Sequence, residues 1–325
     1  MKKTITLLGD IGGTNARFAI IATGDNAYSN FKKLRCDDFK TLIDAIICYL
    51  KDIEVENIES ICIAIAAPIY EKKIKIVNNH WFVDEDELYK VFNVSSINII
   101  NDFAAIAHAI DSIDKSHYLD LGSQEPINIK KLQYNIGIVG PGTGLGSSGL
   151  RKLSNRPITY AAELGHVGFA PQNELQIELV KVLKTKYDRV VNETFVSGPG
   201  LKNIFWALHE IKSKYYSEYS SEEIFNQINN NNLAKQSTEI FFEMLGQVAG
   251  DFALAIGAFD GVLIAGDLVN NHAKLIKESQ FRFGFENKDS YRGLMQKIPT
   301  LLIDVSEVGL LGIYEFHKAK KVECN

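Results

Sequence analysis

The sequence predicts an α/β protein divided into two related domains, and three observations support this prediction. The chain has 325 residues, a length at which one hydrophobic core commonly gives way to two. Short apolar runs typical of strands alternate with segments of helical period. Two units, at residues 4–23 and 135–152, each combine a strand, a glycine-rich turn and a second strand. We interpret them as equivalent hairpins of the two domains.

The first domain is expected to open with its hairpin and to continue with alternating helices and strands. The hairpin strands are expected at residues 4–9 and 16–23, around a tight turn over 9–15. Residues 61–67 are apolar throughout and end at Pro68, a pattern typical of a buried strand. A helix over 38–51, capped by Asp37 or Asp38, would share one apolar face among Leu42, Ile43, Ile46, Ile47 and Leu50. The other expected elements are a helix at 84–92, a strand at 97–100 and a helix at 103–110.

The second domain is expected to repeat the hairpin and then to become helical. Its hairpin strands are expected at 135–139 and 147–152, around a turn over 140–146. Residues 213–237 are polar and include a run of asparagines, which predicts a mobile surface segment. A long helix over 238–257 carries a face of small residues for close packing: Gly246, Ala249, Gly250 and Ala253. The other expected elements are helices from about residue 174, strands at 261–265 and 301–305, and a final helix from about residue 309.

Polar residues over 111–116 indicate where one domain ends. Domain boundaries commonly fall in such exposed, polar stretches. We therefore expect a small α/β domain over residues 1–112 and a large α/β domain over 113–308. The final helix, over 309–325, is expected to return to the small domain and complete it.

Composition excludes several functional classes. Hydrophobic residues are 46% and charged residues 23%, as in ordinary globular proteins, and the net charge of −5 provides no basic surface for nucleic acid or an anionic membrane. The N-terminal apolar stretch is too short for a signal peptide, and the apolar runs are too short to span a membrane. The four cysteines lack metal-ligand spacing; Cys48 and Cys62 are expected in the core, and Cys36 and Cys324 complete the set. A reducing cytoplasm fits this pattern.

The first motif with chemical meaning is the turn of the first hairpin. It reads Gly9-Asp10-Ile11-Gly12-Gly13-Thr14-Asn15-Ala16-Arg17. Adjacent glycines lack Cβ atoms, so their N–H groups can approach a phosphate closely, and Thr14 adds a hydroxyl donor. Asp10 at the end of a strand can hold Mg²⁺ directly or through water. A simple hairpin turn is the alternative, but the flanking carboxylate and hydroxyl favour a phosphate site.

The second motif is the turn Gly140-Pro141-Gly142-Thr143-Gly144-Leu145-Gly146, which again follows a strand. Glycines alternate with a threonine, so this turn can also cradle phosphates. Residues 144–149 additionally match the dinucleotide pattern G-x-G-x-x-G, with Glu163 as the acidic partner. That pattern requires a helix next, and residues 150–157 show no helical stripe. We therefore favour the phosphate turn over a dinucleotide site.

Polar side chains elsewhere could hold a polyhydroxylated substrate. Asp102 follows a buried strand, where α/β sheets place ligand contacts, and it could accept a proton from a sugar hydroxyl. Capping of the following helix is the other interpretation of Asp102, and both can hold. Carboxylates, amides and imidazole suit a ring of hydroxyls, and an aromatic ring suits its apolar face. The candidates are Asn78 with Trp81, Glu163 with His166, and Glu193.

Together these residues resemble the bacterial glucokinase family, within the hexokinase–actin superfamily of ATP-binding folds. The resemblance extends from Leu8 to about Gly312, nearly the whole chain. It is carried by six motifs in the family's order: residues 9–17, Ile99-Ile100-Asn101-Asp102-Phe103, Gly142-Thr143-Gly144-Leu145-Gly146, Glu163-Leu164-Gly165-His166-Val167, Ser197-Gly198-Pro199-Gly200-Leu201, and residues 282–288.

The resemblance implies a two-domain actin-like, ribonuclease H-like fold with an interdomain cleft that closes over glucose. It implies that Asp102 is the catalytic base. It also implies that Asn78, Asn101, Glu163, His166 and Glu193 contact the sugar. The implied phosphate loops are Gly9, Asp10, Ile11, Gly12, Gly13 and Thr14, and a second loop, residues 140–146, that includes Gly142, Thr143 and Gly144. ATP, Mg²⁺ and a homodimer are implied as well, and the lack of cysteines between His166 and Cys324 argues against the structural zinc of related sugar kinases.

Three positions depart from the family pattern. Gly266 is followed by Asp267 where the family's adenosine segment carries a second glycine, which puts the preference for the phosphoryl donor in question. Gly168 stands where relatives often have an acidic residue. Val308 replaces a usual proline before Gly309.

The expected reaction is transfer of a phosphoryl group from ATP to the 6-hydroxyl of glucose, with Asp102 removing the hydroxyl proton. Two other classes stay open. One is a kinase for another acceptor, such as mannose, an amino sugar or a non-sugar. The other is a non-catalytic sugar sensor, although the first strand begins too early for the N-terminal DNA-binding module of sugar-responsive repressors.

Overall fold

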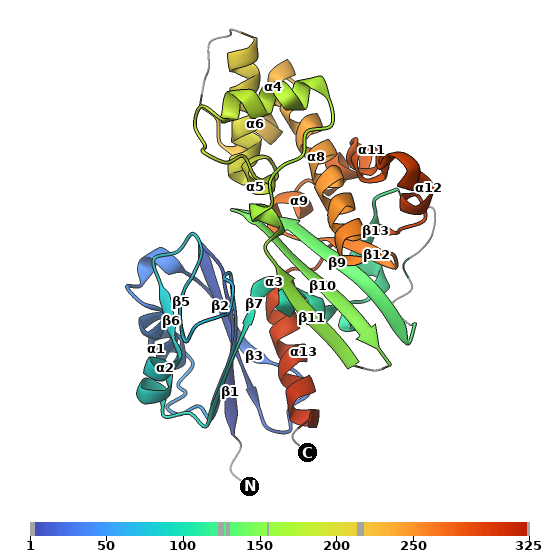
Figure 1. The fold of residues 1–325 in the computed structure, drawn as a ribbon. Helices are drawn as coiled ribbons and strands as arrows, with labels where there is room; N and C mark the ends of the chain where they lie inside the picture. Colours follow the sequence, from blue (N-terminus) through green and yellow to red (C-terminus); the bar gives the residue numbers. More distant parts are fainter. Residues whose placement is uncertain (1–3, 123–126, 128–130, 155, 213–217, 324–325) are drawn as a thin grey trace. The chain divides into compact units, whose positions relative to one another are not determined.

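The computed structural model describes residues 4–122, 127, 131–154, 156–212 and 218–323. The chain forms two compact units (Figure 1). The first comprises residues 1–113 and 305–325, and the second comprises residues 114–304. Each unit is a mixed sheet covered by helices, so the α/β class is confirmed.

The first unit is organised around a five-stranded sheet of order β3-β2-β1-β4-β7. β1 pairs antiparallel with β2, and β2 with β3, whereas β1, β4 and β7 run parallel. A separate small hairpin is formed by β5 and β6. The strands are β1 (Ile5–Ile11), β2 (Asn15–Ala22), β3 (Ser29–Arg35), β4 (Ser60–Ile65), β5 (Lys73–Lys75), β6 (Phe82–Asp84) and β7 (Ser96–Asn101).

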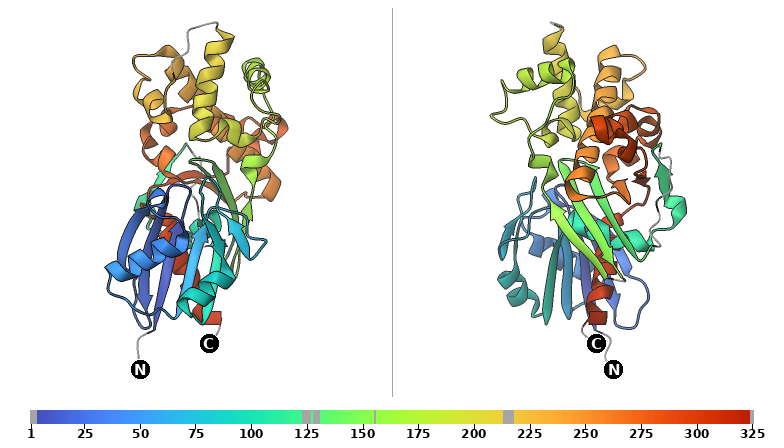
Figure 2. Two further views of the ribbon diagram at one scale, coloured as in Figure 1. Left: turned by 90° about the vertical axis from the view of Figure 1, so that its left-hand side faces the viewer. Right: turned by 45° about the vertical axis from the view of Figure 1, so that its right-hand side comes forward.

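Helices cover both faces of this sheet (Figure 2). Leu42, Ile46 and Leu50 of α1 join the core on one face, together with Leu88 of α2. On the other face, Ala105 of α3 packs with apolar residues of α13. The helices are α1 (Leu42–Asp52), α2 (Glu85–Phe92), α3 (Asp102–Ala109) and α13 (Val308–Glu323), with single 3₁₀ turns at Cys36–Asp38 and Ile110–Ser112.

The second unit repeats the strand order of the first. Its sheet has the order β11-β10-β9-β12-β13-β8, in which the first three strands are antiparallel and β9, β12 and β13 are parallel. β8 is an additional antiparallel edge strand. The two predicted hairpins therefore occupy equivalent places in their sheets. The strands are β8 (Tyr118–Asp120), β9 (Gln133–Pro141), β10 (Leu145–Leu153), β11 (Arg156–Ala162), β12 (Gly261–Ile264) and β13 (Thr300–Ile303).

The helices of the second unit share one large hydrophobic cluster with its sheet. The long helix α8 packs closely against α11, because Cβ atoms at Gly246 and Gly250 would collide with the backbone of Phe281 and Phe285. The predicted small-residue face of this helix is confirmed. The helices are α4 (Glu174–Leu183), α5 (Asn192–Phe195), α6 (Gly198–Ile211), α7 (Ser221–Asn226), α8 (Asn232–Ile256), α9 (Asp267–Asn270), α10 (Ala273–Glu278), α11 (Phe281–Glu286) and α12 (Arg292–Met295), with 3₁₀ turns at Lys115–His117, Leu164–His166 and Asp289–Tyr291.

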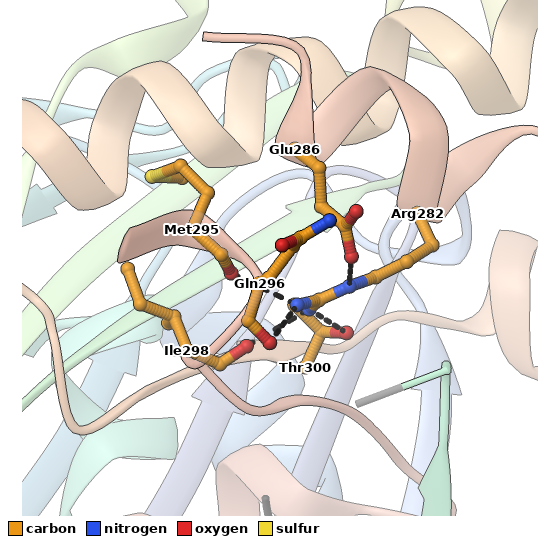
Figure 3. Close-up of polar contacts among 6 residues, drawn as sticks. All are labelled: Arg282, Glu286, Met295, Gln296, Ile298 and Thr300. Atoms are coloured by element: carbon orange, nitrogen blue, oxygen red, sulfur yellow. Dashed lines mark hydrogen bonds and ion pairs between the residues drawn. The ribbon is translucent and has the colours of Figure 1, made fainter. Parts of the chain in front are cut away.

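A single guanidinium group joins α11 to the segment before β13 (Figure 3). Arg282 pairs with Glu286 at 2.6 Å and donates to Thr300 Oγ1 at 3.0 Å. It also donates to the backbone carbonyls of Met295, Gln296 and Ile298, at 2.8 to 3.0 Å. The Arg282 side chain is therefore a structural anchor of the second unit.

Several expectations about local structure were wrong. α1 begins after Thr41, whose hydroxyl and the Asp44 carboxylate form a capping box, and so neither Asp37 nor Asp38 caps it. Ile47 is 48% exposed because the buried stripe turns toward Ala45 and Tyr49. Cys62 is buried as expected, but Cys48 is only partly buried, and Cys324 lies outside the described residues.

The prediction of a mobile surface segment over residues 213–237, which relied on its polar composition, was wrong for the described part of this segment. Within it, α7 and the first turns of α8 are helical, because Ser220 and Asn231 cap them. Residues 213–217 lie outside the described part of the chain. The strands β3, β8 and β11 were also missed. β10 continues directly from the 142–144 turn and no helix follows, so the dinucleotide interpretation is excluded.

No helix in the part of the chain that the structure describes is both long and apolar enough to cross a membrane.

The packing of α3 against α13 predicts acid sensitivity of the first unit. Burial lowers the pKa of His108 to about 4 against an opposing effect of Glu315, and burial together with Lys321 lowers the pKa of His317 to about 4. The unfolded rings have a pKa near 6.5, so the unfolded state binds more protons below that pH. The stabilisation is complete above about pH 6.5 and is lost as the pH falls toward 4. Denaturant titrations at pH 7, 5.5 and 4.5 should show this decline.

His317→Phe should reduce the slope of unfolding free energy against pH between 6.5 and 4. The buried Nε2 of His317 has no hydrogen-bond partner within the described chain, so this change removes no hydrogen bond at that atom. Val91→Thr, at an exposed position of α2 without a titratable group, should keep the wild-type slope. An unchanged slope in His317→Phe would contradict the prediction.

Candidate active site

The first glycine turn is shorter than the sequence predicts. β1 extends through Ile11 and β2 begins at Asn15, so only Gly12, Gly13 and Thr14 lie outside the strands. The Gly12 N–H donates to the Asn15 carbonyl at 3.0 Å. Gly9 and Asp10 are inside β1 together with Ile11, which leaves Gly12–Thr14 as the segment able to surround a phosphate.

Asp10 lies on β1 directly opposite Arg17 on β2. Arg17 Nη1 is 3.5 Å from Asp10 Oδ2, and the Asp10 side chain is 12% exposed. A Cβ atom at Gly309, in the first turn of α13, would lie 2.7 Å from Asp10 Oδ2. Only glycine leaves room for the carboxylate there, and the positive end of the helix dipole favours an anion at that place.

The chemistry of this corner fits a magnesium ion that arrives with a nucleotide. Among the described residues there is no group of three or more His, Cys, Asp or Glu that could hold a metal by itself. Nucleotide-bound Mg²⁺ commonly takes one or two carboxylates and fills its other positions with phosphate oxygens and water. Asp10, lodged in the space that Gly309 leaves open, provides one such carboxylate.

Asn78 and its neighbour lie against the first turn. Asn78 is exposed and has a positive φ of 56°, and a Cβ atom at Gly13 would lie 3.2 Å from its carbonyl oxygen. Asn79 Nδ2 donates to the Gly12 carbonyl at 3.1 Å, while its Oδ1 accepts from Trp81 N at 2.9 Å. Asn79 thus joins the turn to the segment that carries Asn78.

Trp81 is a core residue and not a stacking surface for a sugar. Its side chain is 1% exposed, and its indole N–H donates to the Phe39 carbonyl at 3.1 Å. The interpretation of Trp81 as an aromatic platform was therefore wrong. The Trp81 ring instead packs within the apolar cluster around α1 and β4.

Asp102 follows β7 and is the first residue of α3. The helix cap is Asn101, whose Oδ1 accepts from Phe103 N at 2.9 Å and from Ala104 N at 3.1 Å. Asp102 Oδ1 also accepts from Phe103 N, at 2.9 Å. Because Asn101 performs the capping, the cap interpretation of Asp102 is wrong. Asn101 Nδ2 donates to the Ala67 carbonyl at 3.4 Å, which leaves its second hydrogen for a ligand.

The parallel strands bring Asp102 and the first turn to one edge of the sheet. Ile11, Ile65 and Asn101 lie at one level across β1, β4 and β7. Neighbouring strands are about 4.8 Å apart, so the ends of β1 and β7 are separated by about 10 Å. The 12–14 turn and Asp102 therefore share the carboxyl edge of the first unit's sheet.

In the second unit, Glu193 is fixed beside the second glycine turn. Its Oε2 accepts from Leu145 N at 2.7 Å. A Cβ atom at Gly144 would lie 2.5 Å from this oxygen, and one at Gly165 would lie 3.3 Å from it. The Gly142 carbonyl accepts from Gly198 N, at the start of α6, at 2.8 Å. The turn is thus held from two sides, and Thr143 between them is exposed.

Glu163 precedes the 3₁₀ turn Leu164–His166 and His166 is its last residue, and both residues are exposed. A Cβ atom at Gly165 would lie 2.8 Å from the Leu145 carbonyl oxygen, so the turn is packed tightly against the start of β10. Asn192 Nδ2 donates to the Leu164 carbonyl at 3.0 Å. These contacts bring the 3₁₀ turn beside Glu193 and the second glycine turn.

The predicted residues are divided between the two units. Asp102, Asn78, Asn101 and the first turn belong to the first unit, and Glu163, His166, Glu193 and the second turn belong to the second. Sequence reasoning missed Asn79, which no pattern distinguishes from Asn78. Ser197 was quoted within a motif but given no role; it caps α6 and donates to the Glu193 carbonyl at 2.8 Å, and a serine before Gly-Pro-Gly is a helix-start signal.

The close contact of Glu193 with Gly144 predicts that alanine substitutions at two glycines of the same turn have very different effects on stability. Gly144→Ala should destabilise the protein by about 1–3 kcal/mol, because the new methyl group displaces the carboxylate from Leu145 N. Gly142→Ala is the matched control, since a Cβ atom there meets nothing within 4 Å. Thermal unfolding of both variants measures the difference, and equal stabilities would contradict the described packing.

Comparison with known proteins identifies the family. A family model described as Glucokinase matches residues 7–320. A glucokinase from Colwellia psychrerythraea is 35% identical over 318 residues, which cover 95% of each chain. A glucokinase crystal structure from an Antarctic psychrotroph superposes with a TM-score of 0.81 at 27% identity, covering 97% of this chain and 99% of that chain.

A further solved structure extends the similarity of fold. It is a glucokinase from Balamuthia mandrillaris in complex with glucose, with a TM-score of 0.80 and 20% identity, covering 97% of this chain and 93% of that chain. This identity shows the fold alone, and with the psychrotroph structure it confirms the expected actin-like class. Because the family model and the Colwellia relative both span nearly its whole length, the chain belongs to the glucokinase family.

Proposed function

We propose that the chain transfers the terminal phosphoryl group of ATP to the 6-hydroxyl of glucose, with Asp102 as the general base. Phosphorylation of glucose is the activity of the family to which the chain belongs. The observation that carries the assignment of the base is the shared sheet edge. There a carboxylate at the start of α3 lies two strands from a glycine turn suited to phosphate.

Phosphoryl transfer depends mainly on positioning and on neutralisation of charge. The proposed donors to the phosphates are the backbone N–H groups of the two turns, 12–14 and 142–144, and the hydroxyls of Thr14 and Thr143. Asp10 would hold the magnesium ion, directly or through water, and the ion would neutralise developing charge on the phosphates. Asp102 takes the proton of the attacking hydroxyl.

The proposed sugar contacts come from both units. Glu193 is suited to accept from a hydroxyl through Oε1, because Leu145 N already occupies Oε2. Exposed Glu163 and His166 lie beside it, and Asn101 offers one Nδ2 hydrogen. Asn78 is the remaining proposed contact. A homodimer and a cytoplasmic location stay predictions from the family resemblance.

Asp102→Asn should lower kcat by about 10²-fold to 10⁴-fold, the usual range for loss of a general base. The amide keeps the shape of the carboxylate but cannot accept the proton, so the melting temperature should remain close to wild type. Coupled ADP-release kinetics with glucose measure the loss. Asp86→Asn, at an exposed carboxylate of α2, is the control and should be fully active. A near-wild-type rate in Asp102→Asn would reject the assignment.

A panel of acceptors and donors separates the proposed function from its alternatives. ADP release should be fastest with glucose, and slower with mannose and amino sugars. Binding of glucose without any ADP release would identify a sugar sensor, and a faster rate with another acceptor would identify a different kinase. Replacing ATP by GTP or polyphosphate tests whether Asp267, at the start of α9, alters the preference for the donor.

A further inference from the structure

Arg17 is shared by two carboxylates of the first unit. Its Nη1 lies 3.5 Å from Asp10 Oδ2, and its Nε forms an ion pair with Glu307 Oε2. Arg17 Nε and Glu307 Oε2 are both buried. Buried charges interact more strongly than charges at the surface, because less water screens them. One guanidinium therefore faces two carboxylates of the first unit.

Glu307 reaches Arg17 from an unusual backbone conformation. Its φ is 60°, a left-handed value that residues other than glycine, asparagine and aspartate seldom adopt. Its carbonyl accepts from Leu311 N at 3.1 Å, so Glu307 caps the start of α13, where cap residues are normally extended. Such conformations persist only where their surroundings impose them, and they concentrate at functional sites.

We propose that Glu307 is a positioning residue for phosphoryl transfer, which keeps Arg17 from neutralising Asp10 and so preserves the Asp10 carboxylate for the magnesium ion of the nucleotide. The proposal rests on the role of Asp10 in the proposed function. A guanidinium can bind one carboxylate through two parallel N–H groups. Without the Glu307 carboxylate, the Nε of Arg17 becomes available for a closer, two-pronged contact with Asp10. A carboxylate held in that way competes less well for a cation.

The residue after Glu307 permits this arrangement. Val308 is the first residue of α13. A proline at position 308 would disfavour compact backbone conformations of residue 307 and move it to an extended one, because the ring clashes with the preceding backbone. The Glu307 carboxylate would then leave Arg17. The helix itself tolerates proline at its first position, where the N–H has no partner within the helix.

Two substitutions therefore break the same ion pair by independent routes. Glu307→Gln removes the charge and keeps the shape, whereas Val308→Pro keeps the glutamate and changes its backbone. Glu315→Gln is the matched control, because it removes one carboxylate from the same helix, where Glu315 pairs with Lys318 at 2.8 Å. Isothermal titration calorimetry of the full chain with ADP, in excess magnesium and in EDTA, measures binding without turnover. Circular dichroism verifies the fold of each variant.

In excess magnesium, Glu307→Gln and Val308→Pro should raise the Kd of ADP about three- to tenfold, as loss of one partly buried charge interaction implies. In EDTA, their Kd for ADP should equal or fall below that of the wild type, since less negative charge faces the phosphates. Glu315→Gln should match the wild type in both conditions.

Two results would overturn the proposal. One is an unchanged ratio of the two Kd values in Glu307→Gln, whether both constants stay constant or rise together, which indicates a structural role only. The other is a Val308→Pro variant that folds and keeps the wild-type ratio.

These outcomes are distinct from failure of the proposed function. If the wild type releases no ADP with any sugar, the kinase assignment fails. The magnesium dependence of ADP binding still decides the role of Glu307 in that case. A wild type whose ADP binding ignores magnesium would overturn both the role of Asp10 and this proposal.

Discussion

The hydrogen-bonded register of β1, β4 and β7 is the constraint on which the first unit depends. Ile11, Ile65 and Asn101 share one level, so the segments that follow β1 and β7 emerge at one edge. Gly9 helps to fix this register, because a Cβ atom there would lie 2.8 Å from Ile63 Cγ2. A slip of one residue would turn the side chain of β1 at position 10 to the opposite face of the sheet.

In the second unit, a side chain and not a strand register holds the glycine turn in place. Glu193 accepts a hydrogen bond from Leu145 N, and the two glycines that line its carboxylate leave the space that the carboxylate occupies. The carboxylate therefore has one oxygen bonded to the backbone of the fold, while Oε1 is the oxygen proposed to accept from a substrate hydroxyl. A group held in this way loses little conformational freedom when a substrate binds.

The sequence predicted those parts of the structure that local patterns determine. Both hairpins, the buried strand before Pro68 and the tight face of α8 follow from glycine turns, apolar runs and small residues. Edge strands such as β3 and β11 lack a strong apolar alternation and acquire their structure by pairing with a neighbour. The role of Trp81 depends on a cluster formed by distant segments, and Asn101 rather than Asp102 caps α3 because of where β7 ends. The pairing of Arg17 with Glu307 joins residues 290 positions apart, beyond the reach of any local pattern.

The matching strand orders of the two sheets allow equivalent positions of the two hairpins to be compared, and these positions differ in charge. Duplication of one ancestral unit would give each sheet the same hairpin with the same kind of turn. At the cross-strand position two places from the turn, the first hairpin holds Asp10 opposite Arg17, and the second holds Gly140 opposite Gly146. The charge is therefore confined to one copy. In an enzyme built from two similar halves, the carboxylate proposed to hold magnesium is thus present in one hairpin, and a glycine takes its place in the other.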